Sequence, residues 1–132
     1  MPKTPEKLKK NLFIAGTGFI GSSLIELIKK DDSLKICGLM NSKKMLINLM
    51  GIDFKNWKTK LDNGMNADFE FFINKFSKLS KSIFVDVTAS KQISMKTSKI
   101  LAKGTSVVTA SKIANSENQE YYDEIRVCLL YT

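Results

Sequence analysis

At 132 residues, with 43% hydrophobic and 26% charged residues, the chain is long enough for one globular domain with a buried core, and no apolar run approaches the roughly 20 residues of a membrane span. The absence of histidine and the presence of only two cysteines exclude histidine-based catalytic triads and the usual zinc sites, so we expect no metal site. The net charge is +8, but the lysines are scattered, which favours a solvated surface and an anionic small-molecule ligand over nucleic acid or membrane partners.

The chain begins with a basic leader over residues 1–11, which lacks the continuous apolar core and cleavage site of a signal peptide, so we expect a cytoplasmic protein. After the leader, short apolar runs alternate with segments whose apolar residues recur at helical spacing. These patterns predict, in chain order, a strand over Leu12–Ala15, a helix over Phe19–Lys30, a strand over Leu34–Met40, a short helix over Lys43–Met50 that ends at Gly51, and a helical piece within Ile52–Leu61. Cys37, inside the second strand, is expected to be a buried, reduced thiol, and Cys128 a second free thiol.

The second half of the chain continues the alternation of helical and strand patterns. It predicts a turn at Asp62–Gly64, a helix over Ala67–Leu79, a strand over Ser82–Val87, a helix over Lys91–Lys103, a strand over Ser106–Ala110, a helix from Ser116 or Asn118 to about Arg126, and a strand-like end at 127–132. Such alternation is typical of parallel βαβ units. We therefore expect an α/β fold over residues 12–132: a Rossmann-type, doubly wound, mainly parallel sheet with helices on both faces, truncated before its final C-terminal strands.

A glycine motif joins the first predicted strand to the first predicted helix. Gly16, Gly18 and Gly21 follow the pattern G-x-G-x-x-G, in which the first glycine allows a sharp turn and the second lets the backbone approach a pyrophosphate. The third glycine allows close packing of the helix, whose N-terminus offers N–H groups to phosphate oxygens. The motif is weak alone, but between a strand and a helix it predicts a dinucleotide site.

The end of the second predicted strand indicates which dinucleotide is bound. NAD-preferring domains carry an acidic residue about 20 residues beyond the glycines, whereas this chain has Asn41, Ser42, Lys43 and Lys44 there. Ser42 can donate a hydrogen bond to a 2′-phosphate, and Lys43 or Lys44 can neutralise it. NADP is therefore favoured, and nothing in the sequence excludes NAD. The alternative is that both lysines simply begin a surface helix.

Two later strand ends are expected at the same edge of the sheet, where open parallel sheets bind their ligands. Thr88 and Ser90 suit a nicotinamide ribose, although turn chemistry and a helix cap by Ser90 explain these residue types almost as well. Lys112 follows a buried strand and is expected near the nicotinamide, where a lysine can hydrogen-bond a carbonyl oxygen or carry a proton. An exposed loop lysine is the alternative interpretation.

Together these segments resemble homoserine dehydrogenase, and most closely the dehydrogenase half of bifunctional aspartate kinase–homoserine dehydrogenases. The matching pieces keep the order of that family: LFIAGTGFIGSSLIE (12–26), LKICGLMNSKKML (34–46), GIDFKNW (51–57), FVDVTAS (84–90), SVVTASKIANS (106–116) and YYDEIR (121–126). The NSKKM, GIDFKNW and VVTASKIAN segments together are more specific than the glycine motif.

The resemblance implies an oxidoreductase that interconverts L-aspartate 4-semialdehyde and L-homoserine with NAD(P)H, on the route to threonine and methionine. It also implies the site residues by position. Gly16, Thr17, Gly18, Phe19, Ile20 and Gly21 would hold the pyrophosphate; Asn41, Ser42 and Lys43 the adenosine ribose end; Thr88, Ala89 and Ser90 the nicotinamide side; and Lys112 would contact the cofactor and be the catalytic lysine.

The chain departs from the family pattern in two places. Ser111 stands where the family usually has asparagine before the loop lysine, which could weaken a cofactor contact but keeps the lysine. The family chain also continues into a substrate-binding and dimerisation region with a second lysine, which is absent here. We therefore expect this fragment to be inactive alone and the complete enzyme to be a homo-oligomer.

Other functions remain open at this point. The chain could be the nucleotide domain of another amino-acid dehydrogenase, or a non-catalytic NAD(P)-binding module. Nucleic-acid binding through the net positive charge ranks last, because no aromatic-interleaved basic signature is present.

Overall fold

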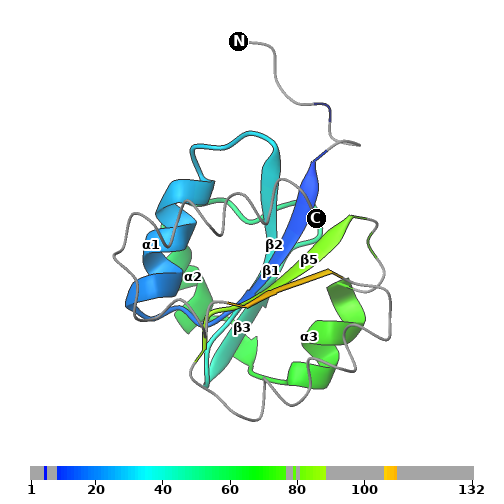
Figure 1. Cartoon of the computed structure of the whole chain (residues 1–132). Helices are drawn as coiled ribbons and strands as arrows, with labels where there is room; N and C mark the ends of the chain where they lie inside the picture. Colours follow the sequence, from blue (N-terminus) through cyan, green and yellow to red (C-terminus); the bar gives the residue numbers. More distant parts are fainter. Residues whose placement is uncertain (1–4, 6–8, 77–78, 80, 89–105, 110–132) are drawn as a thin grey trace.

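Figure 1 shows the computed structural model, which describes residues 5, 9–76, 79, 81–88 and 106–109. A six-stranded sheet runs in the order β4-β3-β2-β1-β5-β6. The strands are β1 Lys10–Ala15, β2 Leu34–Met40, β3 Lys44–Ile47, β4 Met65–Asn66, β5 Ser82–Asp86 and β6 Ser106–Thr109. The strands β2, β1, β5 and β6 are mutually parallel, while β3 and β4 pair antiparallel at one edge. The sheet is thus mainly parallel, as expected.

Helices cover both faces of this sheet. The helices α1 (Phe19–Ile28) and α2 (Trp57–Asp62) lie on one face, and α3 (Phe69–Phe76) lies on the other (Figure 1). Each face has its own apolar core: α1 and α2 pack with residues such as Leu12 and Ile36, and α3 packs with residues such as Phe13 and Phe84. The predicted Rossmann-type architecture is therefore confirmed. No helix in the described part of the chain is long and apolar enough to cross a membrane.

Burial on two faces explains why the strands are continuously apolar rather than alternating. In β1, Leu12 and Ile14 face the α1 side while Phe13 and Ala15 face the α3 side, and all four are fully buried. Cys37 in β2 is buried, as predicted, and forms no disulfide within the described residues. Cys128 lies outside the described residues.

A β-bulge in β2 accommodates the aromatic core. The pairing with β1 shifts between Leu12 and Phe13, so that Phe13 lies opposite Gly38 rather than Cys37. A Cβ atom on Gly38 would overlap the ring of Phe13 and lie 3.0 Å from the ring of Phe72. These two rings pack edge to face, with centroids 5.5 Å apart. The glycine therefore leaves the space that the two rings fill.

The predicted helix over Lys43–Met50 is wrong. Lys44–Ile47 is strand β3, which turns back on β2 through a hairpin, with Met40 opposite Met45 and Gly38 opposite Ile47. Successive side chains of β3 pack on opposite faces: Met45 and Ile47 contact the α3-side core, and Leu46 contacts the α1-side core. A short apolar run of this kind does not distinguish a buried strand from a helix by its periodicity.

Several other boundaries differ from the predictions. The strand β1 begins at Lys10, inside the segment assigned to the leader, and α2 begins only at Trp57. The two-residue strand β4 was not predicted. The strands β5 and β6 occur where the sequence predicts them, and the predicted turn at Asp62–Gly64 begins one residue later, because Asp62 ends α2. The helices predicted over Lys91–Lys103 and up to Arg126, and the final strand, lie outside the described residues.

We expect Gly38→Ala to lower the free energy of unfolding by about 1–3 kcal/mol, because the added methyl group overpacks the ring of Phe13. Urea denaturation of the purified chain measures the change. Adding Phe13→Leu should recover part of the loss, because the leucine side chain leaves space for the methyl group. Equal stability of Gly38→Ala and the unchanged chain would contradict this account.

Candidate functional site

The four parallel strands end side by side at one edge of the sheet. Ala15, the last residue of β1, is paired with Met40 at the end of β2 and with Asp86 at the end of β5. Asp86 is in turn paired with Thr109, the last residue of β6. The segments that follow these strands therefore leave the sheet at one edge, where parallel α/β sheets bind ligands.

The first of these segments is the glycine loop. Gly16 has φ +108°, a conformation that side chains rarely adopt, and a Cβ atom there would lie 2.8 Å from the carbonyl oxygen of Val87. Its amide donates a 2.7 Å hydrogen bond to the carbonyl of Met40. Gly16 thus allows both the turn and close contact with the β2 and β5 ends. A Cβ atom on Gly21 would overlap the carbonyl of Gly16, so the third glycine lets α1 begin directly against this loop.

Gly18 differs from the other two glycines because nothing within the described protein requires it. Its φ of −70° and ψ of −160° are ordinary extended values, and among the residues that the structure describes a Cβ atom at this position would meet no atom within 4 Å. The residue is exposed. The missing Cβ leaves open space in front of the loop, which is the space that a phosphate would occupy.

The N-terminus of α1 carries no group of its own that would repel an anion. Gly18 is the N-cap and has no side chain to cap the helix, and the first turn contains no acidic residue. The hydroxyl of Ser22 donates a 2.9 Å hydrogen bond to the carbonyl of Thr17. This bond ties the glycine loop to the first turn of α1. The helix dipole and the N–H groups of the first turn then favour phosphate.

The second segment is the tip of the β2–β3 hairpin. Oδ1 of Asn41 accepts hydrogen bonds from the amides of Lys43 and Lys44, at 2.8 and 2.7 Å. Asn41 thus holds the loop by its oxygen, and Ser42 and Lys43 are exposed at the tip. The ammonium of Lys44 instead donates to Oδ1 of Asn66 at 3.1 Å. Of the two lysines that the sequence offered for a 2′-phosphate, Lys43 is the one left at the tip.

The third segment follows β5. Asp86, only 1% exposed, accepts hydrogen bonds at Oδ1 from the amide of Thr88 (2.9 Å) and from its hydroxyl (2.7 Å). The methyl carbon of Thr88 lies 3.1 Å from the position of a Cβ atom on Gly16. Asp86 is not among the site residues predicted from the sequence. The signal that could have identified it is a carboxylate near the end of the apolar strand predicted over Ser82–Val87.

The structure brings together most of the residues that the sequence predicts for a dinucleotide site. The glycine loop from Gly16 to Gly21 includes Thr17 and the backbone of Phe19 and Ile20 at the start of α1, and it adjoins the strand end before Asn41 and the turn at Thr88. Ala89, Ser90 and Lys112 lie outside the described residues. The roles of all the predicted site residues in binding or catalysis stay predictions.

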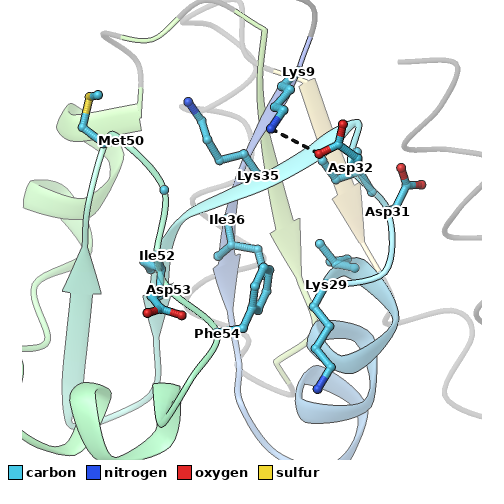
Figure 2. A pocket seen from close by; sticks show the side chains of 13 residues that line it. Lys9, Lys29, Asp31, Asp32, Lys35, Ile36, Met50, Ile52, Asp53 and Phe54 are labelled. Carbon is cyan, nitrogen blue, oxygen red and sulfur yellow. Dashed lines mark ion pairs between the residues drawn. The ribbon is translucent and has the colours of Figure 1, made fainter. Parts of the chain in front are cut away.

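A cavity of about 310 Å³ lies at the opposite edge of the sheet, beside the amino ends of β1 and β2 (Figure 2). It lies between the end of α1, β2 and the loop at residues 50–54, with an apolar floor that includes Ile36 and Phe54. Charged groups at its rim pair with each other or with nearby residues, as in the 3.5 Å ion pair between Lys9 and Asp32. Because it lies at the amino ends of the strands, this cavity is separate from the edge that carries the glycine motif.

The sequence model that describes the homoserine dehydrogenase NAD-binding domain matches residues 16–128. The bifunctional aspartokinase/homoserine dehydrogenase of Haemophilus influenzae is 31% identical over 127 residues, which cover 88% of this chain and 16% of that protein. Its counterpart from Buchnera aphidicola is 32% identical over 133 residues, covering 92% and 16%. The chain thus spans about a sixth of the length of these relatives.

Solved structures share the fold. Homoserine dehydrogenase from Thermoplasma acidophilum superposes with a TM-score of 0.60 at 19% identity, over 88% of this chain and 40% of that one. A hyperthermophilic archaeal homoserine dehydrogenase in complex with NADPH gives a TM-score of 0.59 at 24% identity, over 88% and 41%. Because the family model covers most of its length, the chain belongs to the homoserine dehydrogenase NAD-binding domain family.

Proposed function

We propose that this domain binds NADP(H) across the carboxyl edge of its sheet. The observation that carries the proposal is Gly18, where the backbone conformation is ordinary and the space for a side chain is open. Neither folding nor packing in the described structure requires a glycine at this position. A diphosphate that contacts the loop would explain the glycine, because a Cβ atom at this position would keep the phosphate away from the backbone.

The neighbouring loops fit the rest of such a cofactor. The uncapped N-terminus of α1 would take the pyrophosphate, the hairpin tip at Ser42 and Lys43 the adenosine ribose, and the turn at Thr88 the nicotinamide side. The tip has no carboxylate, and Lys43 adds a positive charge. These features favour the 2′-phosphate of NADP over the 2′-hydroxyl of NAD.

We further propose that, in a complete enzyme, the domain serves the interconversion of aspartate 4-semialdehyde and homoserine. The bound nicotinamide would supply or accept the hydride. The chain itself would hold the diphosphate at Gly16–Gly21 and the 2′-phosphate at the hairpin tip, and Lys112 would orient or protonate the oxygen of the aldehyde. Membership of the family supports this assignment.

The first prediction concerns Gly18. Gly18→Ala should lower NADPH affinity at least about tenfold, because the methyl group occupies the space in front of the loop. It should change the unfolding free energy by less than about 1 kcal/mol, because the methyl group meets no atom of the described part of the chain. Fluorescence titration with NADPH and urea denaturation measure the two quantities. Gly21→Ala is the contrast and should lose both stability and binding. Unchanged NADPH binding by Gly18→Ala would overturn the proposed site.

The second prediction separates the two lysines of the hairpin. Lys43→Ala should weaken NADPH binding roughly tenfold, by the loss of a charged hydrogen bond to phosphate, and leave NADH binding nearly unchanged. Lys44→Ala is the matched control and should have the smaller effect, because its ammonium is bonded to Asn66. Titrations of both variants with NADPH and NADH test this. A larger loss from Lys44→Ala, or equal losses for the two cofactors, would contradict it.

The third prediction is that the 132-residue chain alone shows little or no homoserine-dependent reduction of NADP⁺. The family model that it matches describes the NAD-binding domain, and the resemblance to the family implies that substrate binding relies on a further region. An absorbance assay for NADPH formation at saturating homoserine measures the rate. Robust turnover by the chain alone would show that it contains its own substrate site.

A further inference from the structure

Asp86 places a buried carboxylate at the edge where the cofactor is proposed to bind. It is only 1% exposed, and Ser82 is the other buried polar residue in the part of the chain that the structure describes. Removing a carboxylate from water costs several kcal/mol unless it is well paired. A charge at this position therefore calls for a physical explanation.

The hydrogen bonds with Thr88 use only one of the two carboxylate oxygens of Asp86. Oδ1 accepts both hydrogen bonds from Thr88, one from its amide and one from its hydroxyl. Every buried side-chain nitrogen and oxygen atom within the described ranges has a partner. Oδ2 takes part in neither bond with Thr88, so the turn itself does not use the second oxygen of this buried carboxylate.

A neutral amide could hold this turn equally well. Asn41 uses one Oδ1 atom to accept hydrogen bonds from two backbone amides, and Asn48 accepts one from Met50 in the same way. Asparagine in place of Asp86 would keep the Oδ1 acceptor without the cost of burying a charge. What aspartate adds is a second acceptor, Oδ2, beside the ligand edge.

We propose that Oδ2 of Asp86 accepts a hydrogen bond from an N–H or O–H group on the nicotinamide half of the bound cofactor. This inference rests on the proposed NADP(H) function and assigns a ligand contact to a residue that otherwise only holds Thr88. The hydrogen bonds at Oδ1 fix the carboxylate in one orientation, and the pairing of Asp86 with Ala15 places it beside the strand that leads into the glycine loop.

The test uses Asp86→Asn in the 132-residue chain, with NADPH and 2′,5′-ADP as probes. The variant keeps an oxygen for Thr88 but replaces the second acceptor with an NH₂ donor. NADPH affinity should fall about tenfold to a hundredfold, the usual effect of losing a hydrogen bond to a charged group. Affinity for 2′,5′-ADP, which lacks the nicotinamide half, should stay within about twofold.

Asp68→Asn is the matched control. Asp68 also accepts a hydrogen bond from a backbone amide, that of Phe71, and its replacement removes the same charge from an exposed position. It should leave both affinities unchanged. Circular dichroism and thermal melting report whether each variant is folded.

The outcomes separate this inference from the proposed function. Unchanged or increased NADPH affinity in folded Asp86→Asn would overturn the contact, because a purely structural role predicts no change and charge repulsion alone predicts an increase. An equal loss of 2′,5′-ADP affinity would also overturn it. If the unchanged chain binds neither probe, the proposed function itself fails.

A measurement without substitution covers the case in which Asp86→Asn does not fold. The carboxylate carbon of Asp86 should shift in the NMR spectrum of the ¹³C-labelled chain when NADPH is added, and not when 2′,5′-ADP is added. The same response to both probes, or no response to either while NADPH binds, would refute the contact.

Discussion

The close approach of three backbone segments at Gly16 is the constraint on which the site depends. The end of β5 lies in close contact with this residue on one side, and the first turn of α1 packs directly on its carbonyl. A Cβ atom at Gly16 or Gly21 would force these segments apart. Because the helix starts so near the sheet, its N-terminus lies beside the ends of β1, β2 and β5, and a dinucleotide can contact all of them at once.

The polar groups at this edge divide into those that build the loops and those left for a ligand. Oδ1 of Asn41 holds the hairpin, the hydroxyl of Ser22 holds the glycine loop, and Oδ1 of Asp86 holds the turn at Thr88. Each of these loops is therefore ordered by its own short-range hydrogen bonds. The protein pre-organises the edge before any cofactor arrives, which reduces the entropy lost on binding.

Gly18 and Lys43 differ in how much of their assignment to the site follows from the local sequence. At Gly18 the motif predicts contact with a ligand. The structure supports this prediction, because within the described residues neither the backbone conformation nor the packing requires a glycine there. For the lysine pair the sequence leaves two candidates, because both stand at the end of a strand. The contact of Lys44 with Asn66, a residue 22 positions away, separates them. No local pattern contains that information.

The sequence by itself determined the order of strands and helices around the glycine motif and the burial of β1 and β2, because these follow from short-range periodicity and turn chemistry. The grouping of Gly16–Gly21, Asn41–Lys43 and Thr88 followed from the rule that parallel strands carry their ligand-binding segments at one edge, and from the resemblance to the family. Only the tertiary structure decided that Lys44–Ile47 is a strand, because its short apolar run is compatible with a helix as well. The segment forms a strand because it pairs with β2 and because its alternate side chains pack into the two cores. The same holds for the buried carboxylate of Asp86, whose role depends on Thr88 and on the neighbouring strand end. Strand pairing, side-chain contacts and open space are properties of segments brought together from a distance, and the local sequence does not contain them.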